Sequence, residues 1–322
     1  MDYRILGKSG LNVSRFCLGT MTFGDQVNEK DAIAMVDYAI DNGVNFFDCA
    51  DVYADGQSEV ILGKAVKSKR DKVVLTSKCA GKMSDDINDV GLSRGTIVRH
   101  VDASLKRLDT DYLDVLFLHF PDRKTDLETI LFTMDTLIRS GKIRHYGISN
   151  FPAWMACSMV HKAREANAPA PVVTENPYNV LTRSLEDELL PFIQEYNIAL
   201  MTHNPLAGGL LTGKHRGGKL ATDSRFTRDA GYAKRYVTDA NTLAMETVIE
   251  AAESDGVTPV QLAYQWLLSK EHVTSVICGI SKMSQLEDNI KACCNTSVSK
   301  EALVRCDSVW DDLKGASWSY HY

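Results

Sequence analysis

The chain has 322 residues and a formal net charge of −6, from 36 Lys and Arg against 42 Asp and Glu. A nucleic-acid binder normally carries a basic domain or a clustered basic stripe, whereas the basic stretches here, 67–72 and 214–219, are short and broken. Hydrophobic residues make up 44% and charged residues 24%, as in globular proteins with a large core. We therefore expect a globular protein without a nucleic-acid partner.

The same composition indicates a compartment. The first residues, Met1 to Gly7, form neither a basic stretch nor a sustained apolar run, so no secretory signal is expected. Apolar runs such as 115–118 are strand-sized and predict no membrane span. The 8 cysteines are scattered, without a C-x-x-C pair or a zinc-type spacing. We expect a cytoplasmic protein with reduced thiols and no membrane association.

Short apolar runs alternate with amphipathic segments along most of the chain. Residues 3–6 and 11–14 predict a small hairpin around a Lys-Ser-Gly turn. Helices are predicted over 29–42, over 94–108 with Ser93 as its cap, and over 127–140, where Gly141 ends the helix. Eight strands are predicted, at residues 16–19, 44–47, 73–76, 113–118, 146–148, 172–174, 198–201 and 275–278.

Eight strands in alternation with helices favour a (β/α)₈ barrel of the TIM type over a doubly wound sheet. Without a linker or a shift in composition, we predict a single domain over 1–322, with the hairpin before the barrel. The Gly- and Lys-rich segment 204–238 is predicted to be a long functional or disordered loop. From 297 onward the spacing of Leu303, Cys306, Val309 and Leu313 predicts an extra carboxyl-terminal helix.

In such barrels the catalytic residues follow the strands at their carboxyl ends. Asp48, Lys78 and His119 hold these positions after three successive strands, and Tyr53 lies five residues beyond Asp48. Taken singly, Asp48 is better explained as a cap and His119 as a satisfied core histidine. Together the four residues form a cluster of titratable groups, which indicates an active site.

The local sequences around these residues resemble the catalytic motifs of the aldo-keto reductases. The matching stretches are Asp-Cys-Ala-Asp-Val-Tyr at 48–53, Thr-Ser-Lys at 76–78 and Leu-His-Phe at 118–120. Segments 19–24, 58–59, 147–150, 204–214 and 285–289 also look like that family's segments, in order. The segment 204–214 is most similar to the aflatoxin-aldehyde reductase branch, and the family also includes potassium-channel β-subunits. The resemblance covers nearly the whole chain and implies the same barrel.

The chemistry expected of the cluster is carbonyl reduction. Hydride addition leaves charge on oxygen, so a proton donor and an electrostatic stabiliser must converge there. We expect Tyr53 to be the general acid, with a pKa lowered by Lys78, while Asp48 holds Lys78 and His119 orients the substrate oxygen. The family assigns the same four roles. The substrate would be a small aldehyde or ketone, or an alcohol in the reverse direction.

No side chain supplies hydride, so the reaction requires NADP(H), with NAD(H) as the alternative. The resemblance implies that Ser149 and Asn150 hold the carboxamide, and that a Gly-rich loop beside Lys214 lies along the diphosphate. The expected cofactor contacts are Gly19, Thr20, Met21, Ser149, Asn150, Glu175, His203, Asn204, Pro205, Leu206, Gly208, Leu210, Lys214, Arg225, Gly279, Ser281, Lys282, Gln285 and Asn289. The substrate contacts expected are Phe23, Tyr53, His119 and Phe120, with Met21, Trp154 and the tail 318–322 as further pocket candidates.

Two positions depart from the family. Glu175 stands where the family usually has Gln, and an ionised Glu only accepts hydrogen bonds, so either a bond to the carboxamide is lost or Glu175 is protonated. His203 stands where the family commonly stacks Tyr on the nicotinamide ring. Cys49 and Cys79 each follow a residue of the cluster, and we interpret them as small buried side chains rather than a redox pair.

Two alternatives to the reductase remain at this stage. One is a cofactor-sensing subunit of a larger complex that turns over poorly. The other is a barrel lyase or aldolase that uses Lys78 as a Schiff-base nucleophile, which leaves the phosphate-binding segments unexplained. The intact cluster of Asp48, Tyr53, Lys78 and His119 favours the reductase.

Overall fold

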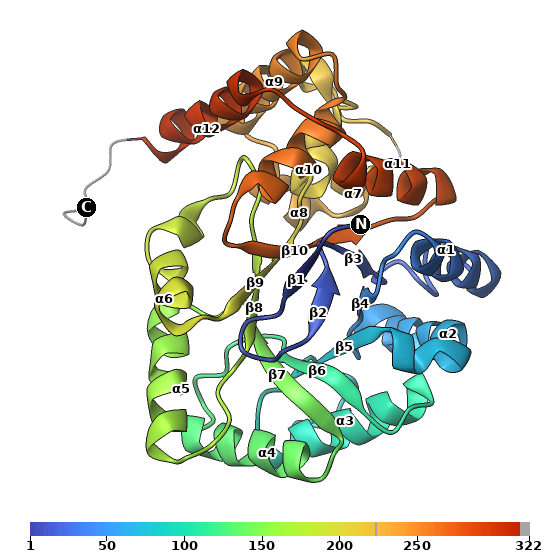
Figure 1. The fold of residues 1–322 in the computed structure, drawn as a ribbon, viewed down its shortest axis with the longest axis vertical. Coiled ribbons are helices and arrows are strands. Elements are labelled where there is room, and N and C mark those ends of the chain that lie inside the picture. Colours follow the sequence, from blue (N-terminus) through green and yellow to red (C-terminus); the bar gives the residue numbers. More distant parts are fainter. Residues whose placement is uncertain (223, 316–322) are drawn as a thin grey trace. The chain divides into compact units, whose positions relative to one another are not determined.

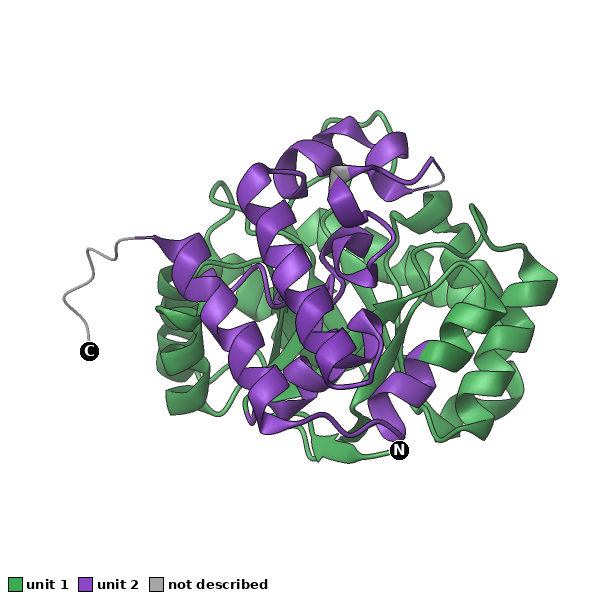
Figure 2. Cartoon of the chain, turned by 90° about the horizontal axis from the view of Figure 1, so that it is seen from above, with its two compact units in different colours: residues 1–176, 185–201, 272–288 green, residues 177–184, 202–271, 289–322 purple. Residues whose placement is uncertain are grey.

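The computed structural model describes residues 1–222 and 224–315. Its contacts divide the chain into two compact units. Unit 1 comprises Met1–Asn176, Leu185–Met201 and His272–Asp288, and unit 2 comprises Pro177–Ser184, Thr202–Glu271 and the chain from Asn289 (Figure 2). A single domain stays a prediction. The tail 318–322, a candidate for the substrate pocket, lies outside the described residues.

The predicted barrel is confirmed. A two-stranded antiparallel hairpin precedes a closed barrel with the strand order β10-β3-β4-β5-β6-β7-β8-β9 (Figure 1). The hairpin strands are β1 (Tyr3–Ile5) and β2 (Asn12–Ser14). The barrel strands are β3 (Phe16–Gly19), β4 (Phe46–Asp48), β5 (Val74–Cys79), β6 (Leu113–Leu118), β7 (Ile143–Ser149), β8 (Val173–Pro177), β9 (Ala199–His203) and β10 (Val273–Gly279).

The barrel strands are apolar because they are covered on both faces. Every residue of β3, β4, β5 and β6 is buried. Leu6 and Val13 of the hairpin region join a core cluster with strand residues such as Phe46, Phe117 and Met201, so the hairpin contributes to the same core. Strand β5 runs three residues beyond the predicted segment 73–76, and this extension carries Lys78. The hydrophobic pattern did not predict this extension, because its side chains are polar although the strand is buried.

Six helices of unit 1 follow these strands and lie outside them in Figure 1. They are α1 (Glu29–Asp41), α2 (Gln57–Val66), α3 (Arg94–Leu108), α4 (Leu127–Arg139), α5 (Ala153–Glu165) and α6 (Leu189–Tyr196). The Ser93 side chain accepts a hydrogen bond from the Thr96 amide, which confirms the predicted cap of α3. Short 3₁₀ turns flank some of these helices: η1 (Tyr53–Gly56), η2 (Lys67–Lys72) and η3 (Ser184–Glu186).

Segment 204–238 differs from the predicted loop, because it contains short helical elements. These are η4 (Ala207–Thr212), η5 (Arg216–Gly218), α7 (Arg225–Arg228) and α8 (Ala230–Tyr236). Ser224 and Thr227 form a capping box, and Asp229 caps α8, so local side-chain bonds start each helix. Helices of 4 and 7 residues are too short to produce a hydrophobic period.

The rest of the helical structure follows this segment. It consists of α9 (Asp239–Ser254), α10 (Pro259–Ser269), α11 (Met283–Cys294) and α12 (Lys300–Lys314). Helix α12 confirms the predicted carboxyl-terminal helix and buries Ala302, Cys306 and Val309 on one face. Within residues 1–222 and 224–315, no helix combines the length and apolar character needed to cross a membrane.

Candidate active site

Three parallel strands of unit 1 bring the predicted cluster together. Asp48 ends β4 and pairs in register with Thr76 of β5, so Lys78 lies two residues further along β5 on the same face. His119 directly follows β6, and Tyr53 begins η1 after the loop that leaves β4. Asp48, Lys78 and His119 therefore lie at the carboxyl ends of neighbouring strands, as the barrel predicts, and Tyr53 lies beyond the loop that follows the first of them.

Lys78 lies at the centre of this cluster. Its side chain has no exposed surface, and its ammonium donates to the carboxylate of Asp48, to the Cys49 carbonyl oxygen at 3.1 Å and to the Tyr53 hydroxyl at 3.3 Å. The Thr76 hydroxyl donates to the other oxygen of Asp48 at 2.7 Å. Burial lowers the pKa of Lys78, but the negative charges around it outweigh burial and raise that pKa well above its ordinary value. The ammonium is therefore charged.

Tyr53 differs in one respect from the expectation. We expected Lys78 to lower the pKa of the phenol; the ammonium does act in that direction, but burial is the larger effect and the pKa of Tyr53 is raised above its ordinary value. Tyr53 is therefore a neutral phenol over the physiological range. A neutral phenol beside an ammonium can give up a proton, because Lys78 stabilises the phenolate that results.

His119 lies beside Tyr53, with their ring centroids 6.2 Å apart and their planes nearly perpendicular. The imidazole stacks on Phe120 at 4.2 Å between centroids. Phe120 and Met21 are exposed, whereas Phe23 is fully buried. Among the predicted substrate contacts, Tyr53, His119 and Phe120 are thus brought together, while Phe23 belongs to the core and its contact with substrate stays a prediction. Trp154 is exposed, and the Arg123 guanidinium lies 5.9 Å from its ring centroid.

Glu175, on β8, faces the same ammonium. Its Oε2 atom lies 3.4 Å from Lys78 Nζ and is buried without a hydrogen bond. Burial and the nearby charge of Asp48 outweigh the attraction of Lys78 and raise the pKa of Glu175 to about 8. Of the two possibilities that the sequence left open, this environment favours a protonated Glu175, which can donate a hydrogen bond as a glutamine does.

Unit 1 holds further predicted cofactor contacts, and two of them, Thr20 and Asn150, contact residues of this cluster. Thr20 directly follows Gly19 in the chain, and its hydroxyl donates to the Asp48 carbonyl oxygen at 2.9 Å. Asn150 has a φ of 60° and donates from its amide nitrogen to Ser149 Oγ at 2.9 Å and to the His119 carbonyl oxygen at 3.3 Å. The predicted contacts near α11 begin after Gly279 at the end of β10, where the backbone nitrogen and hydroxyl of Ser281 donate to Gln285, next to the exposed Lys282.

Unit 2 holds the remaining predicted contacts. After His203, which ends β9, Asn204 Oδ1 accepts from the Gly208 amide at 2.7 Å and shapes the turn that continues through Pro205, Leu206 and the buried Leu210. Gly208 and Gly209 have φ values of 71° and 100°, and a Cβ on Gly209 would lie 3.3 Å from Lys214 Cε. The Arg225 guanidinium lies 3.8 Å from the Tyr232 ring centroid, and Asn289 is buried. The glycines thus let Lys214 lie against the backbone, as an anion site requires.

Sequence reasoning missed the partners that hold the cluster in place. Thr76 belongs to the Thr-Ser-Lys motif, yet its bond to Asp48 follows from strand register, which the sequence does not specify. Cys49 contributes its carbonyl oxygen, while its thiol is buried, lies 3.2 Å from Ser58 Oγ and has a pKa that burial raises to about 12. Cys79 is also buried, with its thiol free. Both thiols fit the interpretation as small buried side chains.

Comparisons with known proteins place these residues in a family context. The model of the aldo/keto reductase family matches residues 15–311. A probable voltage-gated potassium channel subunit beta from Arabidopsis thaliana is 38% identical over 299 residues, which cover 91% of this chain and 91% of that protein. An uncharacterized oxidoreductase, YrpG, from Bacillus subtilis is 36% identical and covers 96% of each chain.

A third relative, the protein tas of Escherichia coli, is 32% identical over 96% of this chain and 97% of its own. The family match begins directly after the hairpin strand β2 and spans the barrel strands and most of α12. The resemblance seen in the sequence is thereby confirmed: the chain belongs to the aldo/keto reductase family of oxidoreductases.

Proposed function

We propose that this protein reduces an aldehyde or a ketone to an alcohol with NADPH, and that Tyr53 is the proton donor. The observation that carries the proposal is the buried Lys78 ammonium, which contacts both the Asp48 carboxylate and the Tyr53 hydroxyl. This arrangement keeps a neutral phenol next to a fixed positive charge. It is suited to protonating an oxygen that gains negative charge.

The steps follow from these residues. His119 orients the substrate carbonyl oxygen toward the Tyr53 hydroxyl, and Tyr53 donates its proton to that oxygen. The phenolate that results is stabilised by the Lys78 ammonium, 3.3 Å away in the structure. When bound, NADPH supplies the hydride for the carbonyl carbon. Hydride and proton together convert the carbonyl to an alcohol, and the same groups serve the reverse reaction.

The residues present fit a nicotinamide cofactor. The Oε2 atom of Glu175 is a buried polar atom without a hydrogen bond. The Glu175 backbone pairs with Ser149 and accepts from the Asn150 amide at 3.0 Å, and the family resemblance assigns Ser149 and Asn150 to the carboxamide. The positive φ values of Gly208 and Gly209 let the Lys214 side chain lie against their backbone, and such a backbone beside a lysine suits a diphosphate. The exposed Lys282 would supply positive charge to a 2′-phosphate, which supports NADPH over NADH. The free cysteines support the cytoplasm as the compartment.

The first test combines cofactor binding with turnover. Fluorescence titration with NADPH and NADH gives the two dissociation constants, and a panel of aldehydes, ketones and sugars gives kcat. We expect tight NADPH binding and a kcat that falls by at least about a hundredfold in Tyr53→Phe, because the proton donor is lost. The control Tyr3→Phe, at an exposed tyrosine of the hairpin, should keep full activity. Equal turnover by Tyr53→Phe and the unmodified protein would contradict the assigned role.

A second candidate is a cofactor-sensing subunit that binds NADPH and turns over poorly. Its support is the Arabidopsis relative, described as a probable voltage-gated potassium channel subunit beta, at 38% identity. The two candidates differ in one outcome of the same experiment. Tight NADPH binding without oxidation by any carbonyl compound of the panel would favour the sensor over the enzyme.

A further inference from the structure

The loop between Asp48 and Tyr53 must hold the phenol in place beside Lys78. The Asp51 amide donates to the Lys78 carbonyl oxygen at 3.3 Å, and the Asp51 side chain is fully buried. One of its carboxylate oxygens accepts from the Val52 amide at 2.8 Å. Gly81 packs directly under Val52, since a Cβ there would lie 2.3 Å from Val52 Cγ1. Asp51 therefore anchors the residue that immediately precedes Tyr53.

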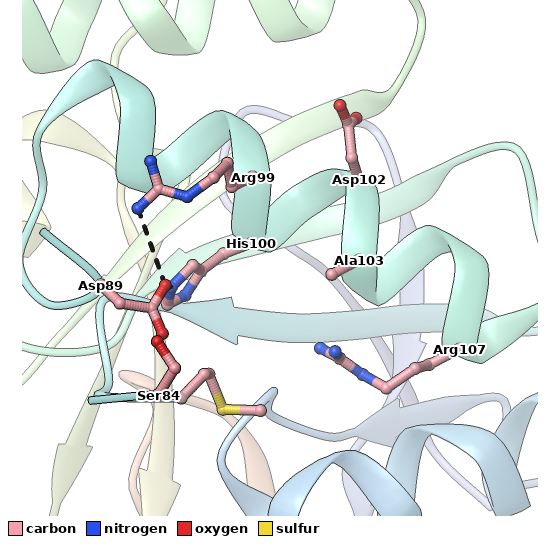
Figure 3. Close-up of a pocket in the computed structure, with 8 residues that line it drawn as sticks. Ser84, Asp89, Arg99, His100, Asp102, Ala103 and Arg107 are labelled. Atoms are coloured by element: carbon pink, nitrogen blue, oxygen red, sulfur yellow. Dashed lines mark hydrogen bonds and ion pairs between the residues drawn. The ribbon is translucent and has the colours of Figure 1, made fainter. Parts of the chain in front are cut away.

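The second oxygen of Asp51 contacts a histidine from a distant helix. His100, on α3, is buried, and its Nδ1 lies 2.7 Å from Asp51 Oδ2. Its other ring nitrogen, Nε2, lies 3.1 Å from Oδ1 of Asp89, in the loop before α3. Figure 3 shows the Asp89 carboxylate between the His100 ring and the Arg99 guanidinium, which lies 3.7 Å from the same oxygen. Ionised carboxylates only accept, so both ring nitrogens carry hydrogen and the ring is an imidazolium.

Several charged groups surround His100, next to a cavity. A cavity of about 540 Å³ adjoins the ring and is lined by Met83, Ser84, Asp89, Arg99, His100, Asp102, Ala103 and Arg107. Of the other charged groups there, Arg107 pairs with Glu59 of α2 at 2.6 Å and Asp102 with Lys142 at 2.6 Å.

Arg99, on α3, and the Cys79 thiol, on β5, complete the groups that face this site. Burial raises the pKa of the thiol, and Asp51 adds to that shift, so Cys79 is neutral. Burial lowers the pKa of His100, but the hydrogen bonds and charges of Asp51 and Asp89 outweigh burial and raise it above its ordinary value. Asp89 itself stays ionised, since the bonds from Ser84 and His100 outweigh burial and lower its pKa.

We propose that His100, clamped between Asp51 and Asp89, is a positioning residue for Tyr53 and thereby sets an alkaline limit to the reduction. The proposal rests on the proposed function of Tyr53. When the imidazolium loses a proton, one carboxylate faces a nitrogen lone pair instead of a donor. If Asp51 loses its donor, it becomes a buried and uncompensated charge, so the loop 49–52 shifts and moves Tyr53 away from Lys78. His100 touches no reacting atom and acts through Asp51.

The test compares charge-removing variants around this histidine. Asp89→Asn keeps the shape and a polar partner for Nε2 but removes the charge, so the imidazolium loses its proton at lower pH. In the pH profile of kcat, the alkaline limb is the range in which kcat falls as the pH rises. We expect this limb to move to lower pH by about one unit. The kcat at pH values below the limb and the KM for NADPH should stay unchanged. Asp102→Asn, whose side chain points away from His100 in Figure 3, is the matched control and should leave the limb in place.

Two further measurements make the inference independent of turnover. Nitrogen NMR of labelled histidine follows the His100 ring directly, and carbon NMR of labelled tyrosine, assigned with Tyr53→Phe, follows the phenol. The Tyr53 resonance should move with the His100 titration, and Asp89→Asn should displace both together. His100→Gln removes the titration, so in that variant the limb and the matching Tyr53 shift should both disappear.

The outcomes separate the two proposals. Absence of turnover with any carbonyl compound would sink the proposed function, while a Tyr53 resonance that follows His100 would still support positioning. If His100 titrates but neither the Tyr53 resonance nor kcat follows it, the histidine merely supports the scaffold and the inference is overturned. The inference would also be overturned if kcat fell at the same alkaline pH in the unmodified protein and in Asp89→Asn. Asp89 lies in a loop whose neighbouring residues are exposed, so this variant tests the idea even if His100→Gln fails to fold.

Discussion

A lysine ammonium without exposed surface is costly unless its charge is compensated. Lys78 meets this condition with the ionised Asp48, the Cys49 carbonyl oxygen and the Tyr53 hydroxyl, which occupy its donors. Because Asp48 already neutralises the ammonium, Glu175 gains little by ionising at 3.4 Å from it. At the scale of single residues, one carboxyl group of the site is thus charged and a second is neutral, and this difference is open to measurement.

The pH dependence of stability tests the protonation of Glu175. Its pKa is raised from 4.5 to about 8, so the native state binds this proton more tightly than the unfolded chain does. The stabilisation is therefore complete below pH 4.5 and is lost as the pH rises through about 8. Glu175→Gln removes this loss. Between pH 5 and 9, we expect the free energy of unfolding of the variant to rise relative to the unmodified protein by at least about 1.4 kcal/mol, the value of one pKa unit.

Urea unfolding at a series of pH values provides the measurement. Glu128→Gln is a suitable control, because Glu128 is an exposed residue of α4 in a surface pair with Lys162. That substitution should leave the pH dependence as it is, since exposed ion pairs contribute little. Parallel curves for Glu175→Gln and the unmodified protein would show that Glu175 is ionised in the native state at neutral pH.

At the scale of the elements, one glycine lets helices α2 and α3 approach each other closely. Gly63, within α2, lies against the carboxyl end of α3, where an added Cβ would lie 2.4 Å from the Leu108 carbonyl oxygen. Alanine normally stabilises a helix relative to glycine. At this position the overlap with backbone atoms outweighs that gain, so we expect Gly63→Ala to lower the free energy of unfolding by about 1–3 kcal/mol.

Gly95→Ala, in the first turn of α3, is the matched control. The nearest atom to an added Cβ there is Arg99 Nη1 at 3.5 Å, an ordinary contact with the end of a flexible side chain. We expect this variant to be as stable as the unmodified protein or more stable, by up to about 1 kcal/mol. Denaturant unfolding measures both changes. A stabilised Gly63→Ala would mean that the two helices separate easily.

The elements also show what the sequence predicts well. Strands buried on both faces leave apolar runs, so all eight barrel strands were predicted, and the residues at their ends follow from the barrel. The extension of β5 was missed because Ser77 and Lys78 are polar, although buried. Helices α7 and α8 were missed because their capping bonds, rather than a hydrophobic period, define them.

Sequence patterns do not predict contacts between side chains that are far apart in the chain. Asp51 and His100 are 49 positions apart in the chain, and no local pattern signals that they meet. The same holds for Glu175 and Lys78, whose separation depends on how far each strand extends and on strand register. The residues of the cluster were therefore predictable from the barrel and the family resemblance, whereas the groups that tune their charges became visible only with the structure.

At the scale of the whole molecule, a chain with a net charge of −6 repels an anionic cofactor. Affinity for NADPH must then come from local cations, and the exposed Lys282 before α11 is the one we expect to meet the 2′-phosphate. A ligand that binds only the folded chain stabilises all of it, by about 2.7 kcal/mol at a hundred times its dissociation constant. Thermal unfolding therefore reports the cofactor preference without any knowledge of the substrate.

We expect NADPH to raise the melting temperature more than the same concentration of NADH does. Lys282→Ala should reduce the NADPH effect and leave the smaller NADH effect unchanged, because NADH lacks the phosphate that this lysine would meet. Lys300→Ala, at the start of α12, removes a positive charge of the same kind elsewhere and should leave both effects as they are. Equal shifts with both cofactors would contradict the preference for NADPH, since the added phosphate would then contribute nothing to binding.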